Sequence, residues 1–189
     1  DFLAQNIEKL NENKFYIEEI WEQLYKNHHP KAIETIIKNK DNPSHRRLVS
    51  RRCIKPEENE FFDWLLLASN PNDKAIELVL KYIKKNKNIE KPRFQDQAYD
   101  YLMDCIKEVH YNPNDKVIKF FSENIDMLDW YRFSKNKNPK AVDMIVKFVE
   151  QDPTNNILKI ELGSLCYNGG DNTIKLFEQH FDFLKSHQL

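Results

Sequence analysis

The sequence has little glycine, few cysteines and almost no net charge. Only 3 of its 189 residues are glycine, which disfavours β-sandwiches, β-barrels and the glycine-rich loops that hold phosphate groups. The 3 cysteines, Cys53, Cys105 and Cys166, are far apart and form no CxxC pair. We therefore expect reduced thiols in an intracellular compartment and no disulfide framework.

Long apolar runs are also missing, and so is a charge of one sign. No run approaches the roughly 20 apolar residues of a membrane-spanning helix, and no signal peptide is visible, although the chain begins at Asp1 rather than Met. Charged residues make up 31% of the chain but leave a net charge of −1. No global field therefore draws the chain to nucleic acid or to an anionic membrane.

What the sequence does contain is one pattern repeated five times, each copy centred on an asparagine. A large apolar residue stands six positions before each asparagine. A small or β-branched residue follows five positions after it, and then Ile or Val. The five centres are Asn27, Asn70, Asn112, Asn136 and Asn168. Internal repetition of this kind is a stronger fold signal than any local propensity.

The second copy, residues 61–85, shows what the pattern means physically. An apolar helical stripe runs up to Asn70, which we expect to end the helix in the left-handed conformation. Pro71 blocks continuation of the helix. Asn72 can then cap a second helix, in which Asp73 places a carboxylate at the positive end of the helix dipole. The unit is predicted to be a helix, a tight turn and a helix.

Five such units predict an all-α fold, a right-handed α-solenoid of about five helix-turn-helix repeats in one domain of residues 1–189. Residues 1–16 are expected to form a capping helix at the N-terminal end. Residues 41–56 form a basic insert between the first two repeats. Residues 177–184 are expected to close the far end. No segment favours a β-strand.

The repeated Trp, Asn, Pro and Ala-Ile or Ala-Val positions resemble the short Trp/Asn-Pro-x-Ala-Ile repeats in proteins of large DNA viruses. The stretch that resembles them most is residues 114–142. More broadly, the chain is similar to HEAT and armadillo-type helical repeats. These resemblances imply a scaffold or interaction role, including one in a large viral assembly. They carry no catalytic residues.

The most unusual local feature is a cluster of arginines in the insert. The chain has 6 arginines, and four of them lie in residues 46–52: Arg46, Arg47, Arg51 and Arg52. Pro43 and Ser44 can start a helix there, with Leu48 and Val49 as its anchors. The planar guanidinium suits carboxylates and phosphates, so the cluster is a candidate site for a partner or another anion. The alternative is internal pairing with the glutamates of residues 57–60, or a solvated insert.

No other residues form a recognisable chemical site. His28 and His29 lack a third metal ligand, and Ser164 lacks the surroundings of a nucleophile elbow. We therefore predict no catalytic residues, no metal, no cofactor and no enzymatic activity. The three tryptophans, Trp21, Trp64 and Trp130, share one repeat position, and we interpret them as core residues rather than an exposed aromatic row.

The sequence thus predicts a protein-protein interaction or assembly scaffold, located in the cytoplasm or within a viral particle. Its partner would be another protein, without membrane insertion, and self-association remains open. The alternative is a nucleic-acid-binding helical-repeat protein that uses the Arg46–Arg52 cluster.

Overall fold

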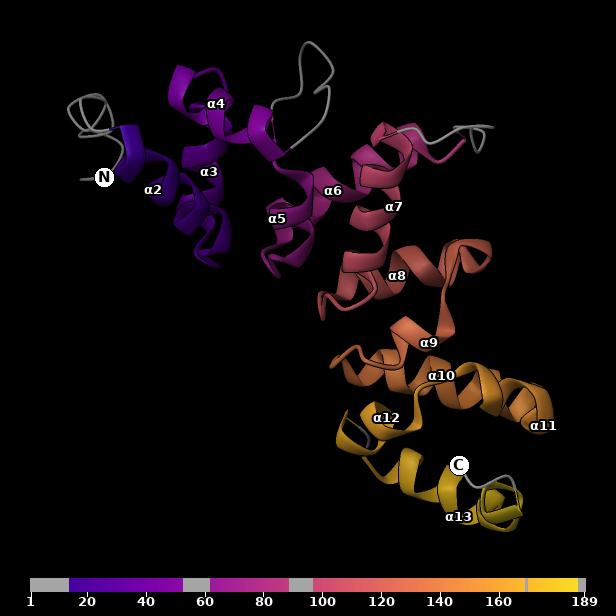
Figure 1. The fold of residues 1–189 in the computed structure, drawn as a ribbon. Coiled ribbons are helices and arrows are strands. Elements are labelled where there is room, and N and C mark those ends of the chain that lie inside the picture. Colours follow the sequence, from indigo (N-terminus) through magenta and orange to yellow (C-terminus); the bar gives the residue numbers. More distant parts are fainter. Residues whose placement is uncertain (1–13, 53–61, 89–96, 169, 187–189) are drawn as a thin grey trace. The chain divides into compact units, whose positions relative to one another are not determined.

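The computed structural model describes residues 14–52, 62–88, 97–168 and 170–186 (Figure 1). Within these ranges the chain forms helices and no strand, so the predicted all-α class is confirmed. The chain divides into two compact units, Asp1–Glu108 and Val109–Leu189. The predicted capping helix at residues 1–16 lies mostly outside the described residues.

In the first unit, helices pack as hairpins that lie against one another. Its helices are α2 (Lys14–Lys26), α3 (Pro30–Lys38), α4 (Pro43–Arg52), α5 (Trp64–Ser69), α6 (Asp73–Asn86) and α7 (Gln97–Val109), of which α7 reaches the boundary between the units. Helix α2 packs on α3, and α5 packs on α6. The two hairpins meet through contacts of α2 with α5 and of α3 with α6.

The second unit is built in the same way. Its helices are α8 (Asp115–Glu123), the 3₁₀ turn η1 (Ile125–Met127), α9 (Trp130–Phe133), α10 (Pro139–Gln151), α11 (Pro153–Asn156), the 3₁₀ turn η2 (Ile157–Lys159), α12 (Leu162–Asn168) and α13 (Asp171–Ser186). Helix α12 packs on α13, and α10 contacts both α8 and α13.

The second helix of each repeat starts at the position predicted from the sequence. Asn72 caps α6, because its side chain accepts the backbone N–H of Lys74 at 2.9 Å. The same bond recurs at Asn114 (2.8 Å), at Asn138 (2.9 Å) and, through a ring nitrogen, at His29 (3.2 Å). These caps give a common register for the repeats, in which position 0 is His29, Asn72, Asn114, Asn138 or Gly170.

The asparagine at position −2 holds consecutive repeats together. Asn70 is only 2% exposed, and its Nδ2 donates to the backbone carbonyls of Tyr25 (2.6 Å) and Asn27 (3.1 Å) in the preceding repeat. Asn136 donates in the same register to the carbonyls of His110 and Asn112, both at 2.8 Å. We call Asn27, Asn70, Asn112 and Asn136 the ladder asparagines. The Nδ2 groups of Asn70 and Asn136 thereby satisfy carbonyls at a helix end and its turn that have no partner within the helix.

The oxygen of each ladder asparagine shapes its own turn. It accepts the backbone N–H two residues later, at distances of 2.8 Å (Asn27), 2.9 Å (Asn70), 3.1 Å (Asn112) and 2.9 Å (Asn136). Asn70 itself has φ −82° and ψ 122°, which is extended backbone. The left-handed conformation expected at Asn70 is therefore wrong. Any residue can adopt this extended backbone. Asparagine is required because its amide both accepts and donates hydrogen bonds.

A second bond between repeats starts at the first helix. The backbone N–H of Asp63 donates to the Tyr25 hydroxyl at 3.0 Å, and that of Asp129 donates to His110 Nε2 at 2.9 Å. The N–H of Glu161 donates to Ser134 Oγ at 2.8 Å. The three donors occupy position −9 and the three acceptors occupy position −4, one repeat earlier. Three different side chains thus accept the equivalent backbone N–H of the next repeat.

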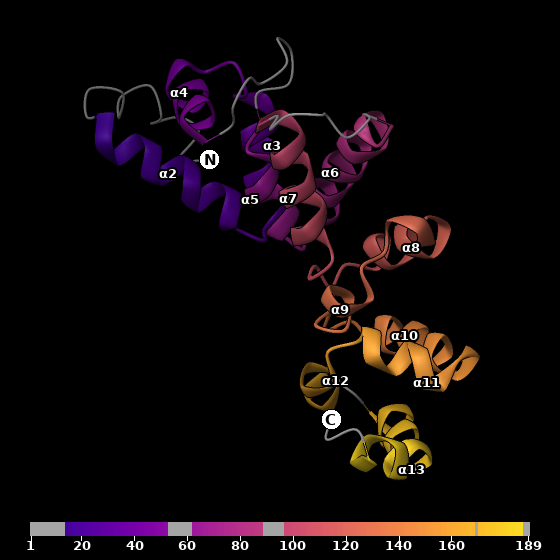
Figure 2. The same ribbon diagram turned by 45° about the vertical axis from the view of Figure 1, so that its right-hand side comes forward.

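Helix α4 of the basic insert packs against α2 (Figure 2), and buried polar groups join the two helices. Its start at Pro43 and the burial of Leu48 and Val49 confirm the predicted helix. Trp21 Nε1 donates to Ser44 Oγ at 3.0 Å. The fully buried His45 lies 2.8 Å from the Tyr25 hydroxyl through Nε2 and 3.0 Å from the Lys40 carbonyl through Nδ1.

These bonds assign a neutral tautomer to His45. The Lys40 carbonyl can only accept, so Nδ1 carries the proton and Nε2 accepts from the Tyr25 hydroxyl. That hydroxyl oxygen in turn accepts the Asp63 N–H of the next repeat. Burial lowers the pKa of His45 below its ordinary value of 6.5, although the bond to the Lys40 carbonyl and the charge of Asp41 oppose this.

We expect Asn136→Asp to destabilise the protein strongly. The substitution keeps the oxygen that accepts the Asn138 N–H, but it removes both donors to buried carbonyls and adds a buried charge. The loss should be at least about 2 kcal/mol in the free energy of unfolding, measured with a chemical denaturant.

The control is Asn27→Asp, the same substitution at an exposed ladder asparagine whose Nδ2 forms no hydrogen bond within the described part of the chain. It should leave the free energy of unfolding nearly unchanged. Equal losses in the two variants would refute the ladder.

The His45 network predicts that the protein loses stability in mild acid. Because the pKa of His45 is lowered in the folded state, the unfolded chain takes up the proton first as the pH falls below 6.5. The stability that depends on neutral His45 is therefore present above pH 6.5 and is lost as the pH falls below it. Melting temperatures measured from about pH 7.5 to about pH 5.5 should fall more steeply for the wild type than for His45→Gln, which has no titrating ring. Parallel slopes would contradict this assignment.

Candidate binding surfaces

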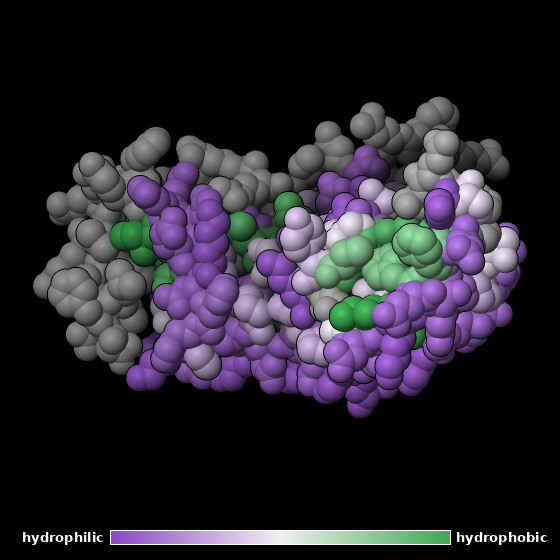
Figure 3. Space-filling model, turned by 90° about the horizontal axis from the view of Figure 1, so that it is seen from below, coloured by the Kyte–Doolittle hydropathy of each residue, from purple (hydrophilic) through white to green (hydrophobic). Residues whose placement is uncertain are grey.

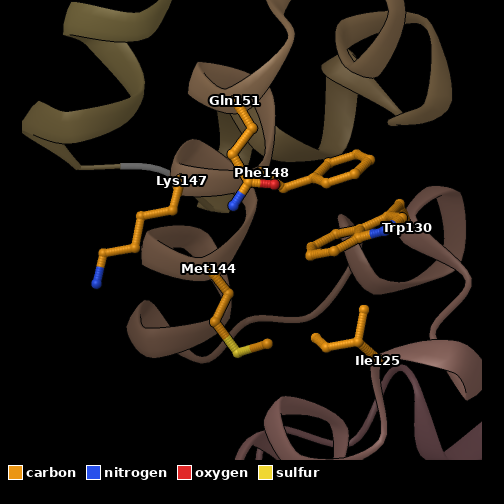
Figure 4. Close-up of a pocket in the computed structure, with 6 residues that line it drawn as sticks. All are labelled: Ile125, Trp130, Met144, Lys147, Phe148 and Gln151. Carbon is orange, nitrogen blue, oxygen red and sulfur yellow. The ribbon is translucent and has the colours of Figure 1, made fainter.

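A pocket of about 300 Å³ opens on the surface of the second unit (Figure 4). Four of its lining residues come from α10, at positions +6, +9, +10 and +13 of the register. The lining residues are Ile125, Trp130, Met144, Lys147, Phe148 and Gln151. Trp130 is held in place as the first residue of α9, because the preceding Asp129 caps that helix through the N–H of Arg132 at 3.1 Å.

The centre of the pocket is a parallel stack of two aromatic rings. The ring centroids of Trp130 and Phe148 are 3.8 Å apart and their planes differ by 5°. Trp64 stacks on Tyr82 in the same way, at 4.4 Å and 7°. Both pairs join positions −8 and +10 of one repeat, so the stack belongs to the repeat pattern. The recurrence of an aromatic residue 18 positions after Trp was a signal in the sequence that the repeat analysis missed.

The two stacks differ in what covers them. Trp64 is 6% exposed, and Phe62 packs edge-on against it with 5.2 Å between ring centroids. The position that corresponds to Phe62 before Trp130 is Leu128, which has no ring. Trp130 is only half-buried. The prediction of core tryptophans is confirmed for Trp21 and Trp64, whereas Trp130 faces a pocket.

The pocket combines a carbon-rich interior with a positive edge. Met144 points toward Ile125 and the Trp130 ring (Figure 4). Lys147 is exposed and, within the residues that the structure describes, makes no ion pair. Lys159 adds a second cation 5.7 Å from the Phe148 ring centroid. Such a site suits an apolar side chain that is followed or preceded by a carboxylate.

The first unit carries a wider and more polar groove of about 580 Å³ between α3 and α6. Its carbon floor is formed by Ile37 and Leu78. Lys74 forms an ion pair with Glu34 across it, and the Lys74 hydrogen bond holds the pKa of the Glu34 carboxyl below its ordinary value. Because this surface is already crossed by an internal ion pair, it is a weaker candidate than the Trp130 pocket.

The structure places the predicted arginine cluster on one helix, α4. Arg46 is exposed, while the side chains of Arg47, Arg51 and Arg52 lie outside the described residues, as does the acidic segment at residues 57–60. Neither the anion-binding interpretation nor the internal pairing is tested. The cluster lies on a helix whose other residues pack against α2, so its position on the first unit is fixed by Leu48 and Val49.

Other candidate chemistry is accounted for locally. His29 serves as the N-cap of α3. Within the described ranges, no group of three or more His, Cys, Asp or Glu side chains could hold a metal ion. None of the helices described is both long and apolar enough to cross a membrane.

Comparison with known proteins gives no relative. The chain matches no protein-family model, no curated protein sequence and no solved structure.

We expect the combined substitution of Arg46, Arg47, Arg51 and Arg52 by Ala to weaken binding of the partner and to leave the fold intact. The anchors of α4 are Ser44, His45, Leu48 and Val49, all buried, and none of them is changed. Circular dichroism and thermal melting should be nearly unchanged, while co-purification of the partner decreases. A cooperative loss of the fold would show instead that the cluster is structural.

Proposed function

We propose that the chain is an α-solenoid of helix-turn-helix repeats that serves as a protein-protein interaction scaffold. Two bonding patterns support the solenoid. The ladder amides and the bonds from position −9 to position −4 recur in both units with the same register. When each repeat contacts its neighbour through the same groups, the repeats stack in one direction.

The observation that carries the binding role is the open Trp130–Phe148 stack. The tryptophan of this aromatic pair is buried in one repeat (Trp64) and half-buried at the same register in another (Trp130), beside Lys147, which makes no ion pair within the described residues. Aromatic rings in a carbon-lined pocket with a polar rim are typical of the anchor points of protein interfaces. The role proposed is binding without catalysis, in an intracellular setting such as a large cellular or viral assembly.

A nucleic-acid-binding role is the second candidate, and the observation that favours it is α4. Four arginines, in two adjacent pairs, lie on a single helix of 10 residues. Arginine side chains on one helix can neutralise several phosphates. This candidate predicts a steep loss of affinity with added salt, whereas the apolar pocket predicts a shallow one.

The proposed function can be tested by co-purification from the native source, with and without nuclease, using three variants. We expect a small set of proteins that survives nuclease with the wild type and is lost with Lys147→Glu and Met144→Glu. Lys137→Glu carries the same charge change as Lys147→Glu at an exposed residue outside the pocket, so this control should retain the partners.

Other outcomes would change the proposal. Loss of all bound material after nuclease would favour the nucleic-acid role and the arginine cluster. Equal retention in all three variants would exclude the Trp130 pocket as the binding site.

A further inference from the structure

Helix α13 exposes the face by which other repeats contact one another. In α3 and α10, which pack on the following helices α6 and α13, the apolar residues of this face are buried. They stand at positions +4 and +7 in α3 (Ile33 and Ile36) and at +4, +7 and +11 in α10 (Val142, Ile145 and Val149), and none is more than 4% exposed. In α13 the same positions hold Ile174, Phe177 and Phe181. Ile174 is 57% exposed, Phe181 is 62% exposed and Phe177 is half-buried.

These three residues form one stripe, because spacings of three and four keep side chains on one side of a helix. Figure 3, in which the molecule of Figure 1 is seen from below, shows a patch of apolar residues among hydrophilic ones. Residues 177–184 were expected to close the array; within them Leu184 is buried, whereas Phe181 is exposed. An isolated exposed apolar residue is ordinary, but a stripe that matches the repeat contact in register indicates an interface.

The first repeat shows the complementary feature. Asn27 is exposed, whereas Asn70, Asn112 and Asn136 are at most 2% exposed. Asn27 Oδ1 accepts the His29 N–H at 2.8 Å, as in every repeat. Its Nδ2, which in Asn70 and Asn136 reaches back to the preceding repeat, makes no hydrogen bond within the described residues.

We propose that copies of this chain associate head to tail, with the first repeat of one copy stacked on α13 of the next. In this junction Asn27 Nδ2 would donate to the backbone carbonyls of Cys166 and Asn168. These two positions correspond in register to Tyr25 and Asn27, which accept from Asn70. The apolar stripe on α13 would be covered in the same way as that of α3 or α10.

The occupant is a second copy because the described residues carry both halves of the junction. Asn27 is a ladder donor without its acceptor, while α12 and α13 carry the acceptor positions and an uncovered stacking face. An interface between two different surfaces of the same molecule is heterologous, so it continues into longer assemblies unless it closes into a ring. This inference extends the solenoid part of the proposed function and does not depend on the Trp130 pocket.

The test uses the purified full chain in sedimentation velocity across a dilution series. The wild type should sediment faster with rising concentration, and two single variants should each remove that increase. Phe181→Glu places a charge in the stripe. Asn27→Asp keeps the oxygen that accepts the His29 N–H and removes only the donor. Gln179→Glu, which adds the same charge on the opposite side of α13, should behave like the wild type.

A mixture of the two variants identifies the geometry. Phe181→Glu retains an intact first repeat, and Asn27→Asp retains an intact α13, so an equimolar mixture should form one junction and stop at dimers. If Asn27→Asp alone still dimerises, the interface is a symmetric pairing of α13 with itself and the proposal is wrong. A wild type that stays monomeric throughout, with all variants folded by circular dichroism, overturns it as well. Neither result affects co-purification through the Trp130 pocket, which is measured separately.

Discussion

The structure depends on one side chain that bonds in two directions. Asn70 and Asn136 each accept a backbone N–H within their own turn and donate to two carbonyls of the preceding repeat. Each therefore fixes the turn and the placement of the neighbouring repeat at once. Both carbonyls belong to a helix end and its turn, where they have no helical partner and would be costly to bury unpaired. Neither aspartate nor leucine supplies both a donor and an acceptor, which explains why asparagine stands at positions 70 and 136.

Because the ladder sets how repeats meet, the rest of each repeat can vary. The acceptor at position −4 is a phenol in Tyr25, an imidazole in His110 and a hydroxyl in Ser134. Each is able to accept one N–H, and that is all the position requires. Tyr25 also holds the insert in place, because the Tyr25 hydroxyl contacts His45 of α4. A segment added between two repeats is thus bonded to the same point that joins them, and burial of a neutral ring makes that attachment sensitive to acid.

Much of the fold could be predicted from the sequence, since the repeated positions are those on which its bonds depend. The turn, the caps at position 0 and the helix of the insert were all predicted from local chemistry. The conformation of Asn70 was not. Asparagine tolerates both the left-handed and the extended backbone, and the choice is made by Tyr25 and Asn27, which lie more than 40 residues earlier. The Trp130 pocket could not be predicted either, because the missing ring at Leu128 matters only once Phe62 is seen to cover Trp64.

Surface function in such a chain arises where a repeat lacks something that its equivalents have. The Trp130 stack is accessible because the ring with which Phe62 covers Trp64 has no counterpart at Leu128, and the α13 stripe is accessible because no described residue covers it. The two surfaces differ in kind. The first is a pocket with cations at its edge, which suits a side chain with a nearby carboxylate. The second is a repeat face, for which we propose another repeat of matching register as the occupant. With both surfaces, a chain could bind further copies of itself while it holds a different partner at the pocket.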